Sequence, residues 1–295
     1  MGQLNFYDEI RRNKTRSWFL LIFSMIFTAF LIWVLSLAFG LDIYIMLIIA
    51  TIVAFFSSYL SYINSDKIAI SMARAFPAKD LKYKHLNNMI EGLSIAAGIP
   101  KPKVYIMPSQ EINAFATGKD PEHAIVCVTE GALNQLTDSE LEGVLGHELS
   151  HVKHYDIRYV TVATVVLGLV SILSQILLRS LWFGGGRNDR DRSGIFILIG
   201  LALAIISPIV LRLVYFAISR RREFMADAGS VQLTRNPKGL ISALKKIEQF
   251  YSQTKKTKVS KTLAPMYFSD PYSIIRKAFS THPPVDERIK KLKAM

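Results

Sequence analysis

One run of the sequence, residues 144–151 (Val-Leu-Gly-His-Glu-Leu-Ser-His), contains the pattern His-Glu-x-x-His. On a helix, side chains four positions apart lie on the same face, so His147 and His151 can direct two imidazoles at one metal ion. Glu148 projects close to the same place. Zinc hydrolases hold their metal and their general base in this arrangement. A coincidental pair of surface histidines is the alternative, and it is unfavourable in a chain with only six histidines.

Two histidines do not complete a catalytic zinc site, which takes three protein ligands and leaves a fourth position for water. The best candidate for the third ligand is Glu223, in the run Glu-Phe-Met-Ala-Asp. Asp227 follows one helical turn later, where it could accept the free N–H of a ligand histidine. The alternative for Glu223 is an ion pair with Arg220 or Arg221, which the histidine pair disfavours. We therefore expect one Zn²⁺ per chain with the ligands His147, His151 and Glu223.

The chemistry that follows is amide hydrolysis. A zinc ion lowers the pKa of bound water toward roughly 7, and Glu148 would take the proton and later pass it to the leaving amine. A noncatalytic, membrane-bound scaffold or chaperone stabilised by a metal is the alternative from another class. Structural zinc sites are usually closed and rich in cysteine, whereas this chain has one cysteine, Cys127, which we expect to be a buried thiol.

The elements around the motif are predicted from local patterns. Thr137 and Glu140 form a capping box, so the helix that carries the motif should start at residue 137. We expect an earlier helix over residues 80–97, because its apolar positions have helical spacing. Strand-like runs are 103–107, 112–117 and 123–129, and two later helices should open at Asn236-Pro237 and at Val285.

Four long apolar runs without charge account for much of the hydrophobic content, 51%. Each has about the length that a helix needs to cross a bilayer, which is about 20 residues. The runs are 18–39, 43–63, 159–178 and 194–211. The predicted domains are a cytoplasmic N-terminal segment (1–16), a transmembrane hairpin (17–63), the first part of a zinc protease domain (64–158), the third and fourth spans with a loop at 179–193 expected to be mobile (159–218), and the second part of the protease domain (219–295).

The formal net charge is +13, and many basic residues flank the apolar runs instead of alternating with aromatic residues. This pattern fits membrane topology, not nucleic-acid binding. Four basic residues precede the first run, so the N-terminus and the catalytic domain should lie on the cytoplasmic side of the cell (inner or plasma) membrane. The arginines of the 179–193 loop oppose this orientation. A membrane-dipping hairpin is therefore the alternative for the last two spans, although we favour full crossing.

Charged residues surround the His-Glu-x-x-His helix, which excludes an intramembrane protease of the site-2 type. They are Glu140, Glu142, Lys153, Asp156 and Arg158. His151 lies eight residues before the third span, or about 12 Å if the helix is continuous. We therefore expect the metal just above the cytoplasmic membrane surface.

Four stretches together resemble the HtpX-like integral-membrane zinc metalloproteases, a family that also includes the CAAX prenyl endoprotease. They are Gly146–His151, Glu223–Asp227, Asn113–Ala116, and Thr281–Pro284 with Arg288. The resemblance covers nearly the whole chain. It implies an α+β, mostly helical integral membrane protein with four transmembrane helices and a zincin-like catalytic domain with a small β-sheet. Its implied substrates are polypeptides, namely misfolded or damaged membrane proteins, and its implied role is protein quality control in the stress response.

The resemblance also implies residue roles. The stretch Asn113, Ala114, Phe115 and Ala116 would be an exposed strand edge that pairs with an extended substrate. His282 would donate to the oxyanion of the tetrahedral intermediate, and Arg288 would assist. The residues alone favour plainer readings, namely an ordinary strand with Phe115 in the core and a loop histidine before two prolines. Neither the residues nor the resemblance predicts the oligomeric state.

Overall fold

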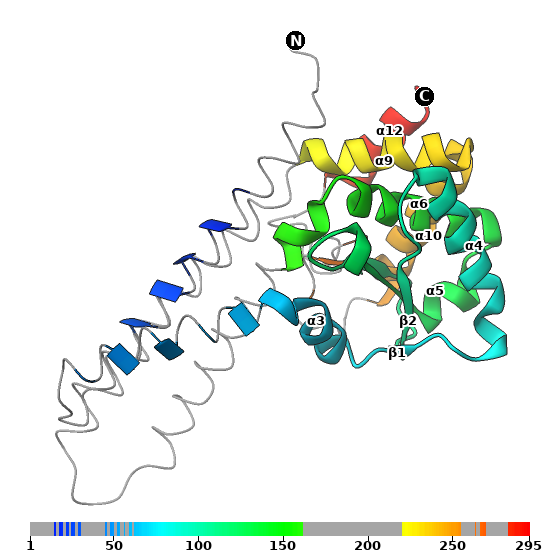
Figure 1. Cartoon of the computed structure of the whole chain (residues 1–295). Helices are drawn as coiled ribbons and strands as arrows, with labels where there is room; N and C mark the ends of the chain where they lie inside the picture. The colour runs from blue at the N-terminus through cyan, green and yellow to red at the C-terminus, as the bar shows by residue number, and fades with distance from the viewer. Residues whose placement is uncertain are drawn as a thin grey trace, which may run out of the picture.

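The computed structural model describes residues 62–161, 220–254, 263, 266–269 and 283–295, with isolated helical residues between 15 and 60. This part of the chain is mostly helical and contains a small mixed sheet (Figure 1). Within these ranges, no helix combines the length and the apolar character that crossing a membrane requires. Most of the predicted spans, the 179–193 loop and His282 lie outside the described residues.

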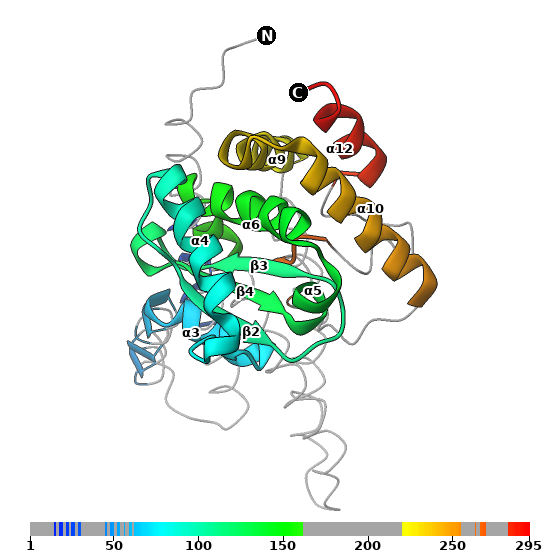
Figure 2. The ribbon, with the colours of Figure 1, turned by 90° about the vertical axis from the view of Figure 1, so that its right-hand side faces the viewer.

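The sheet has four strands in the order β1-β2-β4-β3. Strands β2 and β4 are parallel, whereas the β1–β2 and β3–β4 pairs are antiparallel. The strands are β1 (Phe76–Pro77), β2 (Lys103–Met107), β3 (Ala114–Thr117) and β4 (Ile125–Thr129). Strand β3 is therefore at an edge of the sheet, and this edge lies beside helix α6 (Asp138–Lys153) (Figure 2).

Side chains alternate between the two faces of the sheet, as the period of two in a strand requires. Val104 and Val126 belong to a core that includes the inner face of helix α4 (Lys84–Ala97). Cys127 points to the opposite face and packs in a second core with helix α3 (Ser65–Ala73). Cys127 is buried, as expected, and burial raises the pKa of its thiol. Both faces of the sheet are thus covered.

Helix α6, which carries the His-Glu-x-x-His motif, is central among the described helices. Its capping box is present as predicted, since the amide of Thr137 donates to Glu140 Oε2 at 2.8 Å and the amide of Glu140 donates to Thr137 Oγ1 at 3.4 Å. Helices α9 (Arg220–Thr234) and α10 (Pro237–Thr254) pack against it. Helix α12 (Val285–Leu292) packs on α9 and α10 (Figure 2).

Glycines allow these helices to approach closely. A Cβ atom at Gly143 would lie 2.7 Å from the backbone nitrogen of Leu240, and one at Gly229 would collide with the Ser150 side chain. Ser230 Oγ on α9 donates to the carbonyl of Gly143 on α6 at 2.6 Å. The backbones of α6 and α9 therefore lie close enough for side chains on α9 to reach the motif on α6.

Several boundaries differ from the sequence prediction. The helix expected from residue 80 begins as a 3-10 turn, η1 (Leu81–Tyr83), before α4, and the second and third strands are shorter than predicted. Strand β1 was not predicted because it has two residues and includes a proline, which a sheet tolerates only at an edge. Helix α5 (Glu130–Gln135) was also missed, although Thr129 caps it by accepting from the amide of Ala132.

A buried carboxylate ties α6 to α10. Glu140 Oε2 accepts from Lys246 Nζ at 2.6 Å, and Oε1 accepts from Ser242 Oγ at 2.7 Å. Burial alone would raise the pKa of Glu140, but the hydrogen bonds from Lys246, Ser242 and the Thr137 amide outweigh it and lower the pKa to about 2. The ionised form of Glu140 is therefore favoured in the folded chain.

We expect Lys246→Met to destabilise the fold at pH 7 by about 1–2 kcal/mol. This is the free energy typical of a hydrogen bond to a charged group, reduced because the Lys246 side chain is 36% exposed and water screens the pair. The folded pKa of Glu140 lies below its unfolded value, so this stabilisation is present above about pH 4.5 and is lost as the pH falls toward 2. Denaturation of the full-length variant should show a difference from wild type that shrinks over that window. The exposed neighbour Lys245→Met is the control. A difference that stays constant down to pH 2 would rule out this account.

Candidate active site

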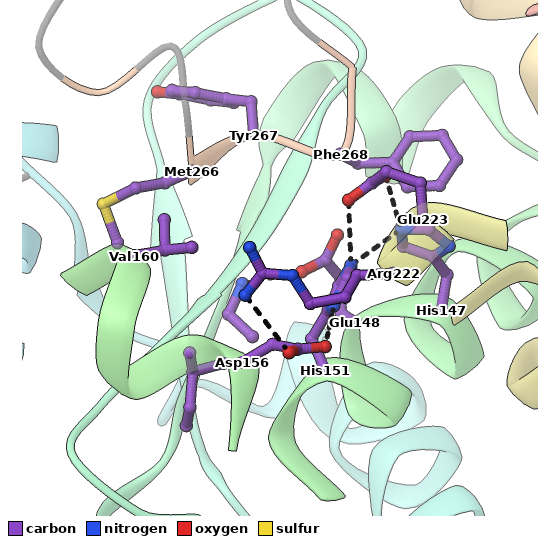
Figure 3. Close-up of a pocket in the computed structure, with 12 residues that line it drawn as sticks. His147, Glu148, His151, Asp156, Val160, Arg222, Glu223, Met266, Tyr267 and Phe268 are labelled. Carbon is purple, nitrogen blue, oxygen red and sulfur yellow. Dashed lines mark hydrogen bonds and ion pairs between the residues drawn. The ribbon is translucent and has the colours of Figure 1, made fainter. Parts of the chain in front are cut away.

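Three side chains from two helices converge on one small pocket (Figure 3). The Nε2 atoms of His147 and His151 on α6 are 3.1 Å apart. The carboxylate of Glu223, in the first turn of α9, lies 3.6 Å from the first Nε2 and 3.5 Å from the second. A tetrahedral zinc ion with bonds of about 2.0–2.1 Å separates its ligand atoms by about 3.3–3.4 Å, so the triangle has the size of a zinc site.

The outer nitrogens of both imidazoles meet carboxylates. His147 Nδ1 lies 2.9 Å from Asp227 Oδ1, and His151 Nδ1 lies 3.0 Å from Asp156 Oδ2. Because an ionised carboxylate only accepts hydrogen bonds, we assign the proton of each neutral ring to Nδ1. Both Nε2 atoms then present lone pairs to each other at 3.1 Å, which is repulsive unless a cation lies between them. The donor set therefore fits a bound metal ion.

The charge balance around the site also favours a cation. Burial by itself disfavours the charged form of His147, but hydrogen bonds to Asp227 and Glu223 outweigh it and raise its pKa. Burial by itself would raise the pKa of Asp227, but the positive charge of Arg288 and the hydrogen bonds from His147 and Arg288 lower it to about 2. The carboxylates thus impose a negative environment at the point where the two imidazoles meet.

Arg288 lies behind this centre. Arg288 is on α12 and is 1% exposed. Two of its guanidinium nitrogens donate to the Asp227 carboxylate, Nη2 to Oδ1 at 2.6 Å and Nε to Oδ2 at 2.9 Å. Its Nη1 donates to the carbonyl of Phe268 at 3.5 Å. The sequence interpretation had Arg288 assist at the oxyanion beside His282. In this structure its guanidinium orients Asp227, and Nη2 also lies 3.4 Å from His147 Nδ1.

Glu148 points into the same pocket and is 3% exposed. Its Oε2 accepts from the backbone N–H of Ala116 on β3 at 2.8 Å, so the edge strand fixes the carboxylate. Burial raises the pKa of Glu148 to about 8, with Glu223 adding to the rise while His151 and the Ala116 amide oppose it. A divalent cation beside it would favour the ionised form. With such a cation bound, the Glu148 carboxylate could accept a proton.

The outer edge of β3 is already partly paired. The carbonyl of Ala114 accepts from the backbone N–H of Phe268 at 2.8 Å, and the N–H of Ala116 is taken by Glu148. The predicted stretch Asn113–Ala116 thus lies beside the candidate centre. One of its backbone acceptors is occupied by a later segment of the chain.

That segment is Met266–Ser269, all four residues of which are buried. Asn113 binds the backbone of Ser269 through both ends of its amide, donating to the carbonyl at 2.9 Å and accepting from the N–H at 3.3 Å. Phe115 points to the face of the sheet opposite to that of Ala114 and Ala116, and its ring centre lies 5.4 Å from that of Tyr267. Met266, Tyr267 and Phe268 line the pocket, a placement that sequence reasoning missed.

Asp156 is a further residue that sequence reasoning missed. The only signal was an acidic residue five positions after the second histidine of the motif. Its contact with His151 depends on the turn that follows α6, where Tyr155 adopts a left-handed conformation with φ of 60°. No periodic pattern predicts such a turn at a tyrosine, because this region is costly for residues with a Cβ atom.

The chain is similar in sequence to known proteins over its whole length. The model of peptidase family M48 matches residues 80–295. A "Protease HtpX homolog" from Dictyoglomus turgidum is 42% identical over the whole chain and 96% of its own length. One from Caldanaerobacter subterraneus subsp. tengcongensis is 43% identical over the whole chain and 99% of its own length.

Among solved structures, that of S. mikatae Ste24p is similar, with a TM-score of 0.50 and 20% sequence identity. The match covers 89% of this chain and 61% of that one, so the chain spans less than two thirds of the length of that structure. At this identity the likeness establishes the fold alone.

Proposed function

Because the chain belongs to peptidase family M48 and is a metalloendopeptidase, we propose that it is a membrane-anchored zinc endopeptidase that cleaves membrane proteins near the cytoplasmic membrane surface. The family assignment confirms the resemblance drawn from four short stretches of the sequence. It also sets aside the noncatalytic scaffold. The observation that carries the proposal is the convergence of His147, His151 and Glu223 beside Glu148.

The donor set supports zinc as the metal. Two imidazole nitrogens and one carboxylate oxygen are typical zinc ligands, whereas Mg²⁺ and Ca²⁺ prefer oxygen ligands alone. When bound by His147, His151 and Glu223, zinc would polarise the substrate carbonyl and lower the pKa of water.

The residues of the chain supply the remaining steps. Glu148, oriented by the Ala116 amide, accepts a proton from the attacking water and delivers it to the leaving amine. Asp227 and Arg288 keep the proton of His147 on Nδ1, so that Nε2 stays available. His282 remains our proposed donor to the oxyanion, on the strength of the matching motif at residues 281–284.

We propose that substrates bind as an extended strand along Asn113–Ala116, since strand addition reads the backbone and tolerates many sequences. The carbonyl of Ala114 is bonded to Phe268 in this structure. A substrate that uses this acceptor must therefore displace the Phe268 amide.

The membrane placement is supported by the sequence. Four charge-free apolar runs, and basic residues before the first of them, fit an N-terminus in the cytoplasm and catalytic parts at 64–158 and 219–295 on that side. We propose that all four runs cross the bilayer. Substrates would then be misfolded or damaged membrane proteins, which expose extended segments close to the bilayer.

Oriented membrane vesicles test this function. Inside-out vesicles that carry the full-length chain should cleave added unfolded casein, whereas sealed right-side-out vesicles should not. A zinc chelator should stop cleavage, and Zn²⁺ should restore it where Mg²⁺ does not. Vesicles carrying Glu148→Gln provide the background. Cleavage by right-side-out vesicles would overturn the orientation, and cleavage that survives chelation would overturn the metal mechanism.

A further inference from the structure

The second histidine of the motif has its own buried carboxylate. His151 Nδ1 lies 3.0 Å from Asp156 Oδ2, and the side chain of Asp156 is only 8% exposed. The other oxygen, Oδ1, accepts from Arg222 Nη1 at 3.5 Å, and the side chain of Arg222 is 3% exposed. Figure 3 shows Asp156 between the two, joined to each by a dashed line.

The same order of groups stands behind the first histidine. His147 Nδ1 meets Asp227, and Asp227 meets Arg288. Each imidazole is therefore backed by a carboxylate, and each carboxylate by a buried arginine. The two carboxylate–arginine contacts differ in length, because Arg288 binds Asp227 with hydrogen bonds of 2.6 and 2.9 Å whereas Arg222 Nη1 lies 3.5 Å from Asp156 Oδ1.

We propose that Asp156, supported by Arg222, is a positioning residue that aims His151 Nε2 at the metal. An acceptor at Nδ1 fixes the tautomer and the rotation of the ring and makes Nε2 a stronger donor. The proposal rests on the proposed function, since it presupposes a metal at Nε2. Asp156 and Arg222 lie 66 positions apart in the sequence, on either side of the predicted third and fourth spans, so their contact also joins the two halves of the catalytic part.

A structural role for Asp156 is the alternative that an experiment must separate. Asp156 opens the helical residues 156–161, and an acidic side chain stabilises the first turn of a helix. Such a role would change the melting temperature without changing how tightly the folded chain binds metal. Metal affinity therefore distinguishes the two roles, whereas activity alone would not.

The test is a zinc competition titration with a chromophoric chelator, on the full-length chain in detergent. Asp156→Asn should weaken zinc binding by about 10–100-fold, the loss typical when the carboxylate behind a ligand histidine is removed. In the Co²⁺-loaded variant the visible absorption bands should shift relative to wild type. The control is Asp138→Asn, because Asp138 also contacts a histidine, His85 at 3.0 Å, but both are exposed and neither lines the pocket of the motif. This control should leave the zinc affinity and the cobalt spectrum unchanged.

Arg222→Gln leaves Asp156 in place and tests the same set of contacts should Asp156→Asn fail to fold. It should weaken zinc binding severalfold, and the double variant should lose less than the product of the two single losses. Wild-type zinc affinity and cobalt spectrum in Asp156→Asn would overturn the positioning role, and independent losses would overturn the support by Arg222. Failure of the proposed function would be distinguishable from failure of this positioning role, because in that case the wild-type chain itself would not need zinc for cleavage.

Discussion

Replacing Glu148 with glutamine should lower kcat for peptide hydrolysis by about 10²–10⁴-fold, the usual contribution of a general base, while zinc stays bound. Glutamine has nearly the same shape, and its amide oxygen can still accept from the Ala116 N–H that holds the carboxylate at 2.8 Å. The variant loses only the capacity to take a proton from water. Because this affects the transition state and not substrate binding, KM should change little.

The measurement is steady-state cleavage of an unfolded polypeptide by the full-length chain in detergent, with zinc content determined on the same sample. Glu142→Gln is the matched control, since Glu142 is on the same helix but does not line the pocket. It should retain wild-type activity. Undiminished turnover in zinc-loaded Glu148→Gln would remove Glu148 from the mechanism.

Replacing Glu223 with alanine should abolish zinc retention and hydrolysis together. Catalytic zinc sites have three protein ligands, and this change leaves only the two imidazoles of His147 and His151. The loss of zinc affinity should exceed the about 10–100-fold that is typical for a residue that only orients a ligand. Glu223→Ala should therefore be more severe than Asp156→Asn in the same titration.

Zinc content of the purified full-length variant is the measurement, and it should fall from about one ion per chain to almost none. Glu91→Ala provides the control, because Glu91 is an exposed carboxylate on α4 that pairs with Lys101 at 2.7 Å. A Glu223→Ala chain that keeps one zinc ion with wild-type affinity would show that the third ligand is another residue.

The parts of the site that depend on local geometry could be predicted from the sequence. The spacing of His147 and His151 and the capping box at Thr137 involve residues within one or two turns, so helix geometry fixes them. Strand β2 was predicted with the bounds that it has, since its run of β-branched and aromatic residues is typical of a strand. The position of Glu223 required more, namely a pattern of two histidines and a carboxylate shared by zinc hydrolases.

The remaining features depend on contacts between distant segments. The contact of Arg288 with Asp227 was not predicted. A guanidinium with 1% exposure needs a buried carboxylate, and the packing of α12 on α9 brings the two residues together. Asp156 reaches His151 through a left-handed turn at Tyr155. Neither contact leaves a periodic signal in the sequence.

Anomalous diffraction at the zinc absorption edge, from crystals of the active full-length chain, tests the metal centre most directly. The account predicts one anomalous peak within bonding distance of His147 Nε2, His151 Nε2 and the Glu223 carboxylate, at about 2.0–2.2 Å from each ligand atom. The absence of a peak among these three side chains in an active preparation, or a peak at other residues, would contradict the account.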